Sequence, residues 1–190
     1  MREIVIIRHG ETIANKERRY CGITDLSLSD EGKSNLLKLK GLYSFIDSSY
    51  TLYSSGLKRA NESIELLFDN PKYNIEAGLQ EMNFGDFENK TYDELNIDLK
   101  YQEWIKDVYN NKTPNGESYL ECRDRIVNSF KKILDENKNN IVIVAHGGTM
   151  FHILDYLFKE DKNIYELQLD NGHGVLITEN NNSFSYKVIE

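Results

Sequence analysis

The sequence contains little cysteine and little proline, and it has no long apolar run. Its two cysteines, Cys21 and Cys122, form neither a CxxC pair nor a disulfide framework, so we expect free thiols in a reducing compartment. No run of 18 apolar residues occurs and no cleavable signal pattern precedes residue 20, which predicts a cytoplasmic protein without a membrane span. The only two prolines lie singly in polar stretches, and no linker interrupts the chain, so we expect residues 1–190 to form one domain.

The chain also lacks an excess of positive charge, because its formal net charge is −8. Nucleic acids and anionic membranes bind basic surfaces, so we expect neither as the main partner. The first twenty residues differ from the rest, with five cationic and three anionic side chains. This contrast predicts a small cationic pocket on an acidic body, which suits a small anionic metabolite. No feature of the sequence indicates the oligomeric state.

Apolar runs alternate with stretches of helical periodicity along the chain. We predict strands at residues 3–7, 51–54, 74–77, 141–145, 175–179 and 184–189. Helices are predicted to begin near Ser29, Ser55, Thr91, Glu117 and Thr149, with Ser54 and Ser55 as caps of the second helix. Continuous apolar strands alternating with helices favour an α/β fold with a mainly parallel central sheet covered by helices on both faces.

Two histidines stand directly after two of these strands. His9 follows the run at residues 4–7 with Arg8 before it, and His146 follows the run at residues 141–145 with two glycines after it. Ligands of open α/β sheets bind at the carboxyl ends of the strands. We therefore expect His9 and His146 to meet at one edge of the sheet.

Several familiar sites are incomplete in this sequence. Residues 32–34 resemble the end of a nucleotide P-loop, but the required glycine five positions earlier is Ser27. The loop at residues 172–174 has Ile177 where a dinucleotide motif needs glycine, and neither cysteine is followed at the sixth position by the arginine of a cysteine phosphatase. The four histidines show no HxxxH or HxH spacing, so we expect neither a metal nor a cofactor.

Arginine and histidine together suit the transfer of a phosphoryl group. A phosphate monoester carries about two negative charges near neutral pH, and guanidinium groups match its oxygens in a bidentate manner. Arg8 and Arg59 are the candidates for this role. A neutral imidazole can attack phosphorus without a separate base, and a second, protonated imidazole can stabilise the charge that develops on the phosphoryl oxygens.

Six short segments carry a more specific signal when taken in order, and they lie at residues 8–15, 22–29, 54–60, 81–88, 114–118 and 145–148. Together they resemble the histidine phosphatase superfamily, also called phosphoglycerate mutase-like. Any single segment could arise by chance, whereas the ordered set covers nearly the whole chain. The resemblance implies a three-layer α/β sandwich and a metal-independent phosphomonoesterase.

The resemblance also implies roles for individual residues. His9 corresponds to the nucleophile that becomes phosphohistidine, while Arg8, Arg59 and His146 complete the phosphate pocket. Glu81 corresponds to the proton donor, a role that requires a carboxyl group able to hold a proton near neutral pH. After the alcohol leaves, the same group would deprotonate the water that attacks phosphohistidine.

Four further positions correspond to substrate contacts in the family: Asn15, as an additional phosphate donor, and Cys21, Gly22 and Thr24. His152 lies six residues after His146, on a different helical face, so we expect a structural role for it. His173 is equally compatible with a loop over the site and with a hydrogen-bonded turn. Tyr92, Trp104 and Tyr109 have a spacing compatible with a pocket wall or with a core.

Within the superfamily, residues 79–88, Trp104, 114–118 and 170–172 are most similar to the α-ribazole-5'-phosphate phosphatase branch. Members of that branch remove phosphate from a nucleotide-like intermediate in assembly of the lower ligand of cobalamin. The pair His173-Gly174 departs from that branch, which has a cysteine or aromatic pair there. The best candidate substrate is therefore α-ribazole 5'-phosphate.

Two alternatives remain beside this assignment. The first is a sugar-phosphate or phosphoglycerate phosphatase, or a phosphoglycerate mutase, built on the same catalytic residues. Mutases of the family are longer and continue differently after the acid, which favours a hydrolase. The second is a non-catalytic phosphate-binding sensor, although such a sensor would need neither His9 nor Glu81.

Overall fold

A mixed sheet of six strands lies at the centre of the computed structural model, which describes residues 1–159, 167, 169–181 and 183–189. In chain order the strands are β1 (Arg2–Arg8), β2 (Tyr50–Ser54), β3 (Tyr73–Ile75), β4 (Asn140–Ala145), β5 (Gly174–Asn180) and β6 (Ser183–Ile189). Their order across the sheet is β3-β2-β4-β1-β5-β6. The first four in that order are parallel, and β5 and β6 close the sheet as an antiparallel hairpin.

The register of β1 and β4 determines where the two histidines lie. Arg8 pairs with Ala145 across these parallel strands, so His9 and His146 are the next residues on neighbouring strand ends. The backbone N–H of His9 donates to the carbonyl of Ala145 at 2.9 Å. The expected convergence of the two strand ends is therefore present in the fold.

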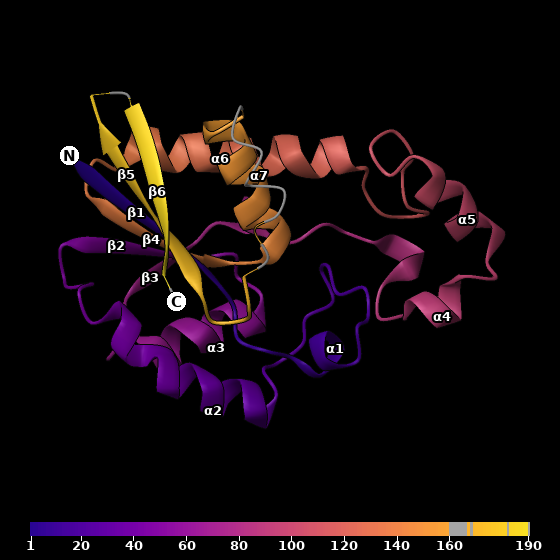
Figure 1. The fold of residues 1–190 in the computed structure, drawn as a ribbon, viewed down its shortest axis with the longest axis horizontal. Helices are drawn as coiled ribbons and strands as arrows, with labels where there is room; N and C mark the ends of the chain where they lie inside the picture. The colour runs from indigo at the N-terminus through magenta and orange to yellow at the C-terminus, as the bar shows by residue number, and fades with distance from the viewer. Residues whose placement is uncertain (160–166, 168, 182, 190) are drawn as a thin grey trace.

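Helices cover both faces of the sheet, as Figure 1 shows. One face is covered by α2 (Asp30–Leu39), the 3-10 helix η1 (Lys40–Tyr43) and α3 (Lys58–Leu67), and the other by α6 (Tyr119–Glu136) and α7 (Gly147–Leu157). Alternate residues of β1 point to the two layers, because Val5 and Ile7 pack with α2 and α3 while Ile4 and Ile6 pack with α6 and α7. The predicted three-layer α/β sandwich is confirmed.

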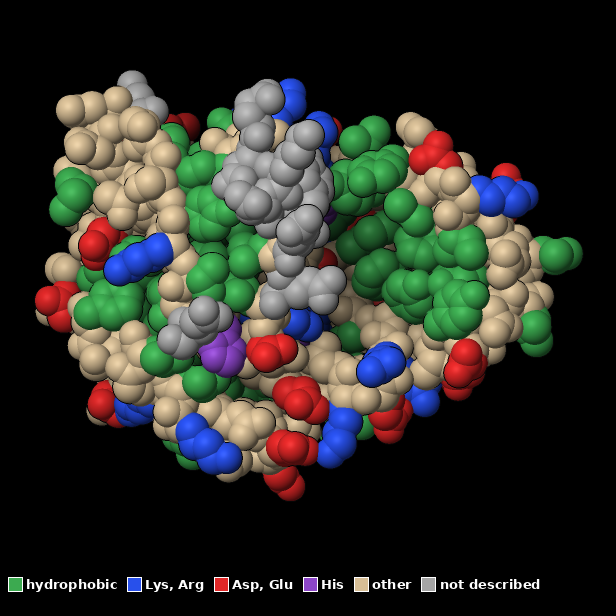
Figure 2. Space-filling model, viewed as in Figure 1, with side chains coloured by type: hydrophobic (Ala, Val, Ile, Leu, Met, Phe, Trp, Pro, Cys, Tyr) green, Lys and Arg blue, Asp and Glu red, His purple; other side chains and the backbone are tan. Residues whose placement is uncertain are grey.

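Short elements extend the molecule beyond the sheet. These are α1 (Ile13–Lys16), η2 (Ala77–Leu79), η3 (Gly85–Phe87), α4 (Tyr92–Leu95) and α5 (Leu99–Lys106). Trp104 is 6% exposed and packs edge-on against Tyr20 and Phe84, so it belongs to an aromatic core. Tyr92 and Tyr109 are exposed, and Figure 2 shows apolar side chains gathered over α4 and α5. No helix in the described part of the chain is long and apolar enough to cross a membrane.

Several element boundaries differ from the predicted ones. Helix α3 begins at Lys58 rather than near Ser55, and its N-cap residue Leu57 makes no capping bond through its side chain. The predicted caps are engaged elsewhere, because Ser54 Oγ donates to Asn61 and Ser55 Oγ contacts His146.

Other starts fall within two residues of the prediction: Ser29 and Thr91 cap α2 and α4, Ser118 caps α6, and α7 begins at Gly147. Strand β3 ends at Ile75, because Ala77 already belongs to η2. Helix α5, capped by Asp98, was not predicted.

Candidate active site

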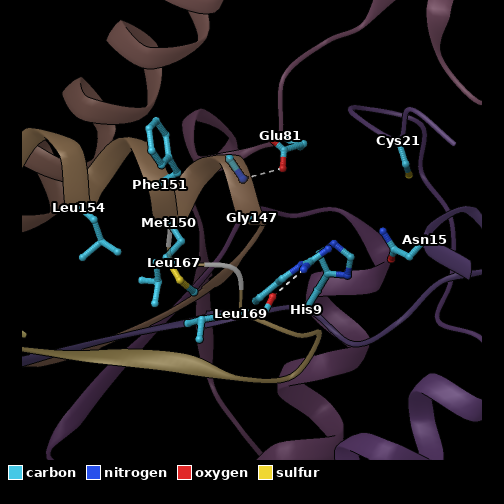
Figure 3. A pocket seen from close by; sticks show the side chains of 12 residues that line it. His9, Asn15, Cys21, Glu81, Gly147, Met150, Phe151, Leu154, Leu167 and Leu169 are labelled. Carbon is cyan, nitrogen blue, oxygen red and sulfur yellow. Dashed lines mark hydrogen bonds between the residues drawn. The ribbon is translucent and has the colours of Figure 1, made fainter. Parts of the chain in front are cut away.

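A cavity of about 410 Å³ opens beside the carboxyl ends of β1 and β4. Figure 3 shows its lining side chains, which come from the end of β1, α1 and the loop after it, the segment before η3, α7 and residues 167 and 169. Its lining residues are Arg8, His9, Asn15, Cys21, Glu81, Gly147, Gly148, Met150, Phe151, Leu154, Leu167 and Leu169. The cavity is therefore polar around His9 and apolar along α7 and the chain at residues 167 and 169.

The imidazole of His9 is held in one tautomer. Its Nδ1 lies 2.6 Å from the carbonyl oxygen of Gly10, and a carbonyl can only accept a hydrogen bond. Nδ1 therefore carries the hydrogen, and Nε2 keeps its lone pair. Burial, followed by the positive charge of Arg59, holds the pKa of His9 well below its ordinary value. The ring is accordingly a neutral nucleophile at physiological pH.

Arg59 lies fully buried behind His9 and connects the two histidines. Its Nε is 3.3 Å from His9 Nε2 and 3.3 Å from His146 Nδ1. Its two terminal nitrogens donate to backbone carbonyls, to Thr24 at 2.9 Å and to Gly22 at 2.6 Å. Four partners thus fix the guanidinium in a single orientation.

His146 is also buried, and its ring centroid lies 5.1 Å from that of His9. Because Arg59 donates to its Nδ1, the hydrogen is on Nε2, which donates to Ser55 Oγ at 2.9 Å. Burial, then Arg59 and His9, hold the pKa of His146 well below its ordinary value. Both rings are therefore neutral before an anion enters the site.

Arg8 brings a second guanidinium to the cavity wall. One terminal nitrogen donates to the carbonyl of Leu169 at 2.7 Å, whereas the buried Nε has no hydrogen-bond partner among the described residues. Burial lowers the pKa of Arg8, and the nearby Glu81 and Asp170 partly offset that effect. An arginine remains charged after such a shift, so Arg8 offers a desolvated cation with an unused donor.

The carboxylate of Glu81 faces this region from the opposite wall (Figure 3). One oxygen accepts from the backbone N–H of Gly148 at 3.0 Å and the other from the N–H of Met82 at 3.0 Å. A side chain at Gly148 would place its Cβ 2.2 Å from Glu81 Oε1, so the glycine permits this approach. Arg125 fixes the backbone by donating to the carbonyls of Gln80 at 2.9 Å and Glu81 at 3.2 Å.

The four predicted substrate contacts divide into two pairs. Asn15 and Cys21 line the cavity, and Asn15 Oδ1 is held by Thr12, which leaves the amide NH₂ as a donor. Gly22 and Thr24 are not among the lining residues and instead hold Arg59 through their carbonyls. All nine predicted site residues therefore belong to one connected region of the structure.

The remaining histidines lie outside the cavity lining. His152 is buried with its ring 4.8 Å from that of Tyr119, and burial lowers its pKa to about 4. His173 contributes its backbone carbonyl, which accepts from the N–H of Arg8 at 2.9 Å. In the described part of the chain, no group of three or more His, Cys, Asp or Glu side chains is placed to hold a metal ion.

Sequence reasoning missed the residues that support the site. Ser55 holds His146, Arg125 holds the backbone at Glu81, and Asn171 donates to the carbonyl of His9 at 2.9 Å. Glu88 accepts from the loop that binds Arg59. Ser55 and Glu88 lie inside the matching segments, which is the only sequence signal for them.

Comparisons with known proteins identify the family of this chain. The sequence matches the family model of the histidine phosphatase superfamily (branch 1) over residues 4–190. A 2,3-bisphosphoglycerate-dependent phosphoglycerate mutase from Parabacteroides distasonis is 30% identical over 211 residues, covering 89% of this chain and 83% of that protein. The chain therefore belongs to the histidine phosphatase superfamily and is a phosphatase enzyme of that family.

Two solved structures are similar over almost their full length. A candidate alpha-ribazole-5'-P phosphatase from Escherichia coli has a TM-score of 0.90 at 24% identity, covering 100% of this chain and 96% of that chain. The alpha-ribazole phosphatase from Shigella flexneri has a TM-score of 0.87 at 25% identity, covering 98% and 95%. The Escherichia coli likeness establishes the shared fold.

Proposed function

We propose that the protein is a metal-independent phosphomonoesterase that forms phosphohistidine on His9, and that its substrate is α-ribazole 5'-phosphate. The observation that carries the reaction is the tautomer of His9: the bond from Nδ1 to Gly10 leaves the lone pair on Nε2, where it accepts only a long hydrogen bond of 3.3 Å from Arg59 Nε. His9 lines a cavity together with Arg8, whose Nε has no partner among the described residues, and with the carboxyl group of Glu81.

In the first half of the reaction, His9 Nε2 attacks phosphorus as the bond from phosphorus to the alcohol oxygen breaks. Glu81, protonated at this stage, gives its proton to the departing oxygen. Arg8 and Arg59 counter the charge of the phosphoryl oxygens, and the incoming phosphate dianion favours uptake of a proton from solvent on His146 Nδ1, which Arg59 Nε then releases. The products are the free alcohol, a Glu81 carboxylate and N-phosphorylated His9.

In the second half, water enters beside Glu81, and the carboxylate removes a proton from it as the water oxygen attacks phosphorus. The N–P bond breaks, inorganic phosphate leaves, and His9 Nε2 regains its lone pair. Glu81 is protonated again and ready for the next substrate. The hydrogen bond from the Gly148 N–H keeps the Glu81 carboxyl group in position for both steps.

The composition of the cavity supports α-ribazole 5'-phosphate as the substrate. Besides its polar end, the wall includes Met150, Phe151, Leu154, Leu167 and Leu169. Among the described lining residues, Arg8 is the single Lys or Arg. A phosphoglycerate carries a carboxylate in addition to phosphate and needs further cations, whereas the base of a nucleotide-like substrate gains from an apolar wall.

A phosphoglycerate mutase is the second candidate, favoured by the 30% identity to the mutase from Parabacteroides distasonis. It would use the same phosphohistidine but pass the phosphoryl group to a phosphoglycerate instead of water. The alpha-ribazole phosphatase from Shigella flexneri supports the hydrolase assignment.

The nucleophile is tested by single-turnover assays of the wild type and His9→Ala in excess chelator. We expect an acid-labile phosphoenzyme in the wild type, none in His9→Ala, and a fall in kcat of at least about a thousandfold. His173→Gln is the matched control, because it removes an imidazole outside the cavity lining. Equal turnover in wild type and His9→Ala refutes phosphohistidine chemistry at this residue.

The substrate is tested by comparing α-ribazole 5'-phosphate, 3-phosphoglycerate and a simple sugar phosphate at equal concentrations. The highest kcat/KM is expected for α-ribazole 5'-phosphate. If the trapped phosphoenzyme transfers its phosphoryl group to added 3-phosphoglycerate faster than to water, the mutase assignment replaces the hydrolase.

A further inference from the structure

Glu88 lies outside the cavity lining, yet its carboxylate is surrounded by donors. It accepts from the backbone N–H groups of Gly22 at 3.1 Å, Ile23 at 3.0 Å and Thr24 at 3.2 Å. It also accepts from the Thr24 hydroxyl at 2.5 Å and from the N–H of Phe84 at 3.0 Å. One side chain therefore ties the loop at residues 22–24 to the segment that begins η3.

The opposite side of the same loop holds a catalytic group. The carbonyls of Gly22 and Thr24 accept from the two terminal nitrogens of Arg59. The loop thus directs its N–H groups to Glu88 and two of its carbonyls to Arg59. Each residue of the loop binds Glu88, and two of the three bind Arg59.

The packing leaves this loop little freedom to shift. A Cβ at Gly22 would lie 1.7 Å from the carbonyl oxygen of Met82 and 2.3 Å from Glu88 Oε1. Such distances require the glycine and place the backbone directly against Glu88. A change in the Glu88 side chain is therefore transmitted to the carbonyls that orient Arg59.

We propose that Glu88 is a positioning residue for phosphoryl transfer, which acts through the loop at residues 22–24 to hold the Arg59 guanidinium between His9 and His146. This inference rests on the proposed phosphatase reaction. Arg59 Nε is 3.3 Å from a nitrogen of each ring, so a small rotation of the guanidinium separates it from both. Glu88 anchors the side of the loop opposite the two carbonyls that hold Arg59.

A second carboxylate supports the other wall and offers a comparison. Glu117 accepts from the N–H of Asn83 at 2.8 Å and from Arg125 at 2.5 Å, and Arg125 holds the backbone of Glu81. Loss of Glu117 is therefore expected to disturb proton transfer by Glu81. Loss of Glu88 is expected to disturb the phosphate pocket and the two imidazoles instead.

The test is Glu88→Gln, which turns one oxygen into an NH₂ group facing N–H donors. We expect kcat/KM to fall by roughly a hundredfold, consistent with displacement of a catalytic group by about 1 Å. The dissociation constant for inorganic phosphate should rise at least several-fold. Asp86→Asn is the matched control, since it removes an exposed carboxylate that bonds to Asn115 and should change neither quantity.

A spectroscopic readout separates positioning from general structural damage. The charge of Arg59 helps to keep both ring pKa values low, so its displacement should raise the pKa of His9 and His146 toward the ordinary value. NMR titration of the imidazole C–H signals in unliganded Glu88→Gln measures this rise. Glu117→Gln should leave the His9 titration unchanged while lowering kcat, because Arg125, the partner of Glu117, acts on the pKa of His146 and not on that of His9.

The proposal is overturned if folded Glu88→Gln has wild-type imidazole titrations and wild-type phosphate affinity. If that variant does not fold, Thr24→Val removes only the hydroxyl donor and should change both readouts in the same direction, by less. Wild-type values in folded Thr24→Val then overturn the proposal. Absence of phosphoenzyme in the wild-type protein would reject the proposed reaction, whereas the imidazole titration still decides the role of Glu88.

Discussion

Replacement of Gly148 by alanine tests the placement of the proton donor without touching its carboxyl group. The added Cβ would lie 2.2 Å from Glu81 Oε1 and 3.0 Å from its carboxyl carbon. Ordinary contacts between such atoms need about 3.5 Å, so the carboxylate must retreat by roughly 1 Å. That movement also breaks the hydrogen bond from the Gly148 N–H.

The expected loss follows from this displacement. A misplacement of about 1 Å costs roughly a hundredfold in rate, which lies within the range of about a hundred to ten thousand for general acid–base catalysis. Protein stability should change in the opposite direction, because alanine is favoured over glycine by up to about 1 kcal/mol in a helix. Lower activity with equal or higher stability is therefore the signature of a displaced Glu81.

Rapid-quench kinetics with p-nitrophenyl phosphate make the test specific. Its leaving group needs little protonation, so phosphohistidine should still form in Gly148→Ala. Water attack needs the Glu81 carboxylate, so the phosphoenzyme should accumulate and turnover should slow. With an alkyl phosphate, whose leaving group needs a proton, both formation and hydrolysis of the phosphoenzyme should slow.

Gly147→Ala is the matched control, because its nearest contact would be Arg8 Nε at 3.7 Å. That variant leaves Glu81 in place and should keep its rate of phosphoenzyme hydrolysis, with any effect confined to KM. Equal phosphoenzyme hydrolysis rates in Gly148→Ala and wild type would refute the role of Glu81 in the second step.

Two further predictions concern stability and substrate choice. The pKa values of His9, His146 and His152 are depressed, so below pH 6.5 the unfolded chain binds more protons and stability falls as pH falls. Between pH 7.5 and pH 5.5 the free energy of unfolding should fall by about 1.4 kcal/mol per histidine, or roughly 4 kcal/mol in total, as measured by urea denaturation. His152→Gln should remove about one third of this loss. A urea midpoint that does not change with pH would contradict the burial argument. Phe151→Ala should raise KM for α-ribazole 5'-phosphate about tenfold and leave KM for glycerol phosphate unchanged, because only the first substrate has a base to bury. Equal changes in the two KM values would show that Phe151 has no role in substrate choice.

Local patterns in the sequence were enough to predict the strands and the positions of the two histidines. Continuous apolar runs at residues 4–7 and 141–145 are typical of strands buried on both faces of a parallel sheet, and a polar residue directly after such a run is expected at the strand end. His9 and His146 were therefore predictable from local pattern. Arg8 and Arg59 were candidates from the chemistry of phosphoryl transfer, and the ordered segments added Glu81, which local pattern does not distinguish from the other acidic residues nearby.

The way these groups are held depends on tertiary packing. Ser55 reads as a helix cap in the sequence but contacts His146, and Glu88 reads as one acid among several in residues 76–88 but anchors the loop that binds Arg59. These bonds join residues that are 37 to 91 positions apart in the chain, from Arg59 with Gly22 to Ser55 with His146. Short-range periodicity reports which face of a strand or helix is buried, whereas a hydrogen bond between distant loops depends on the packing that brings them together.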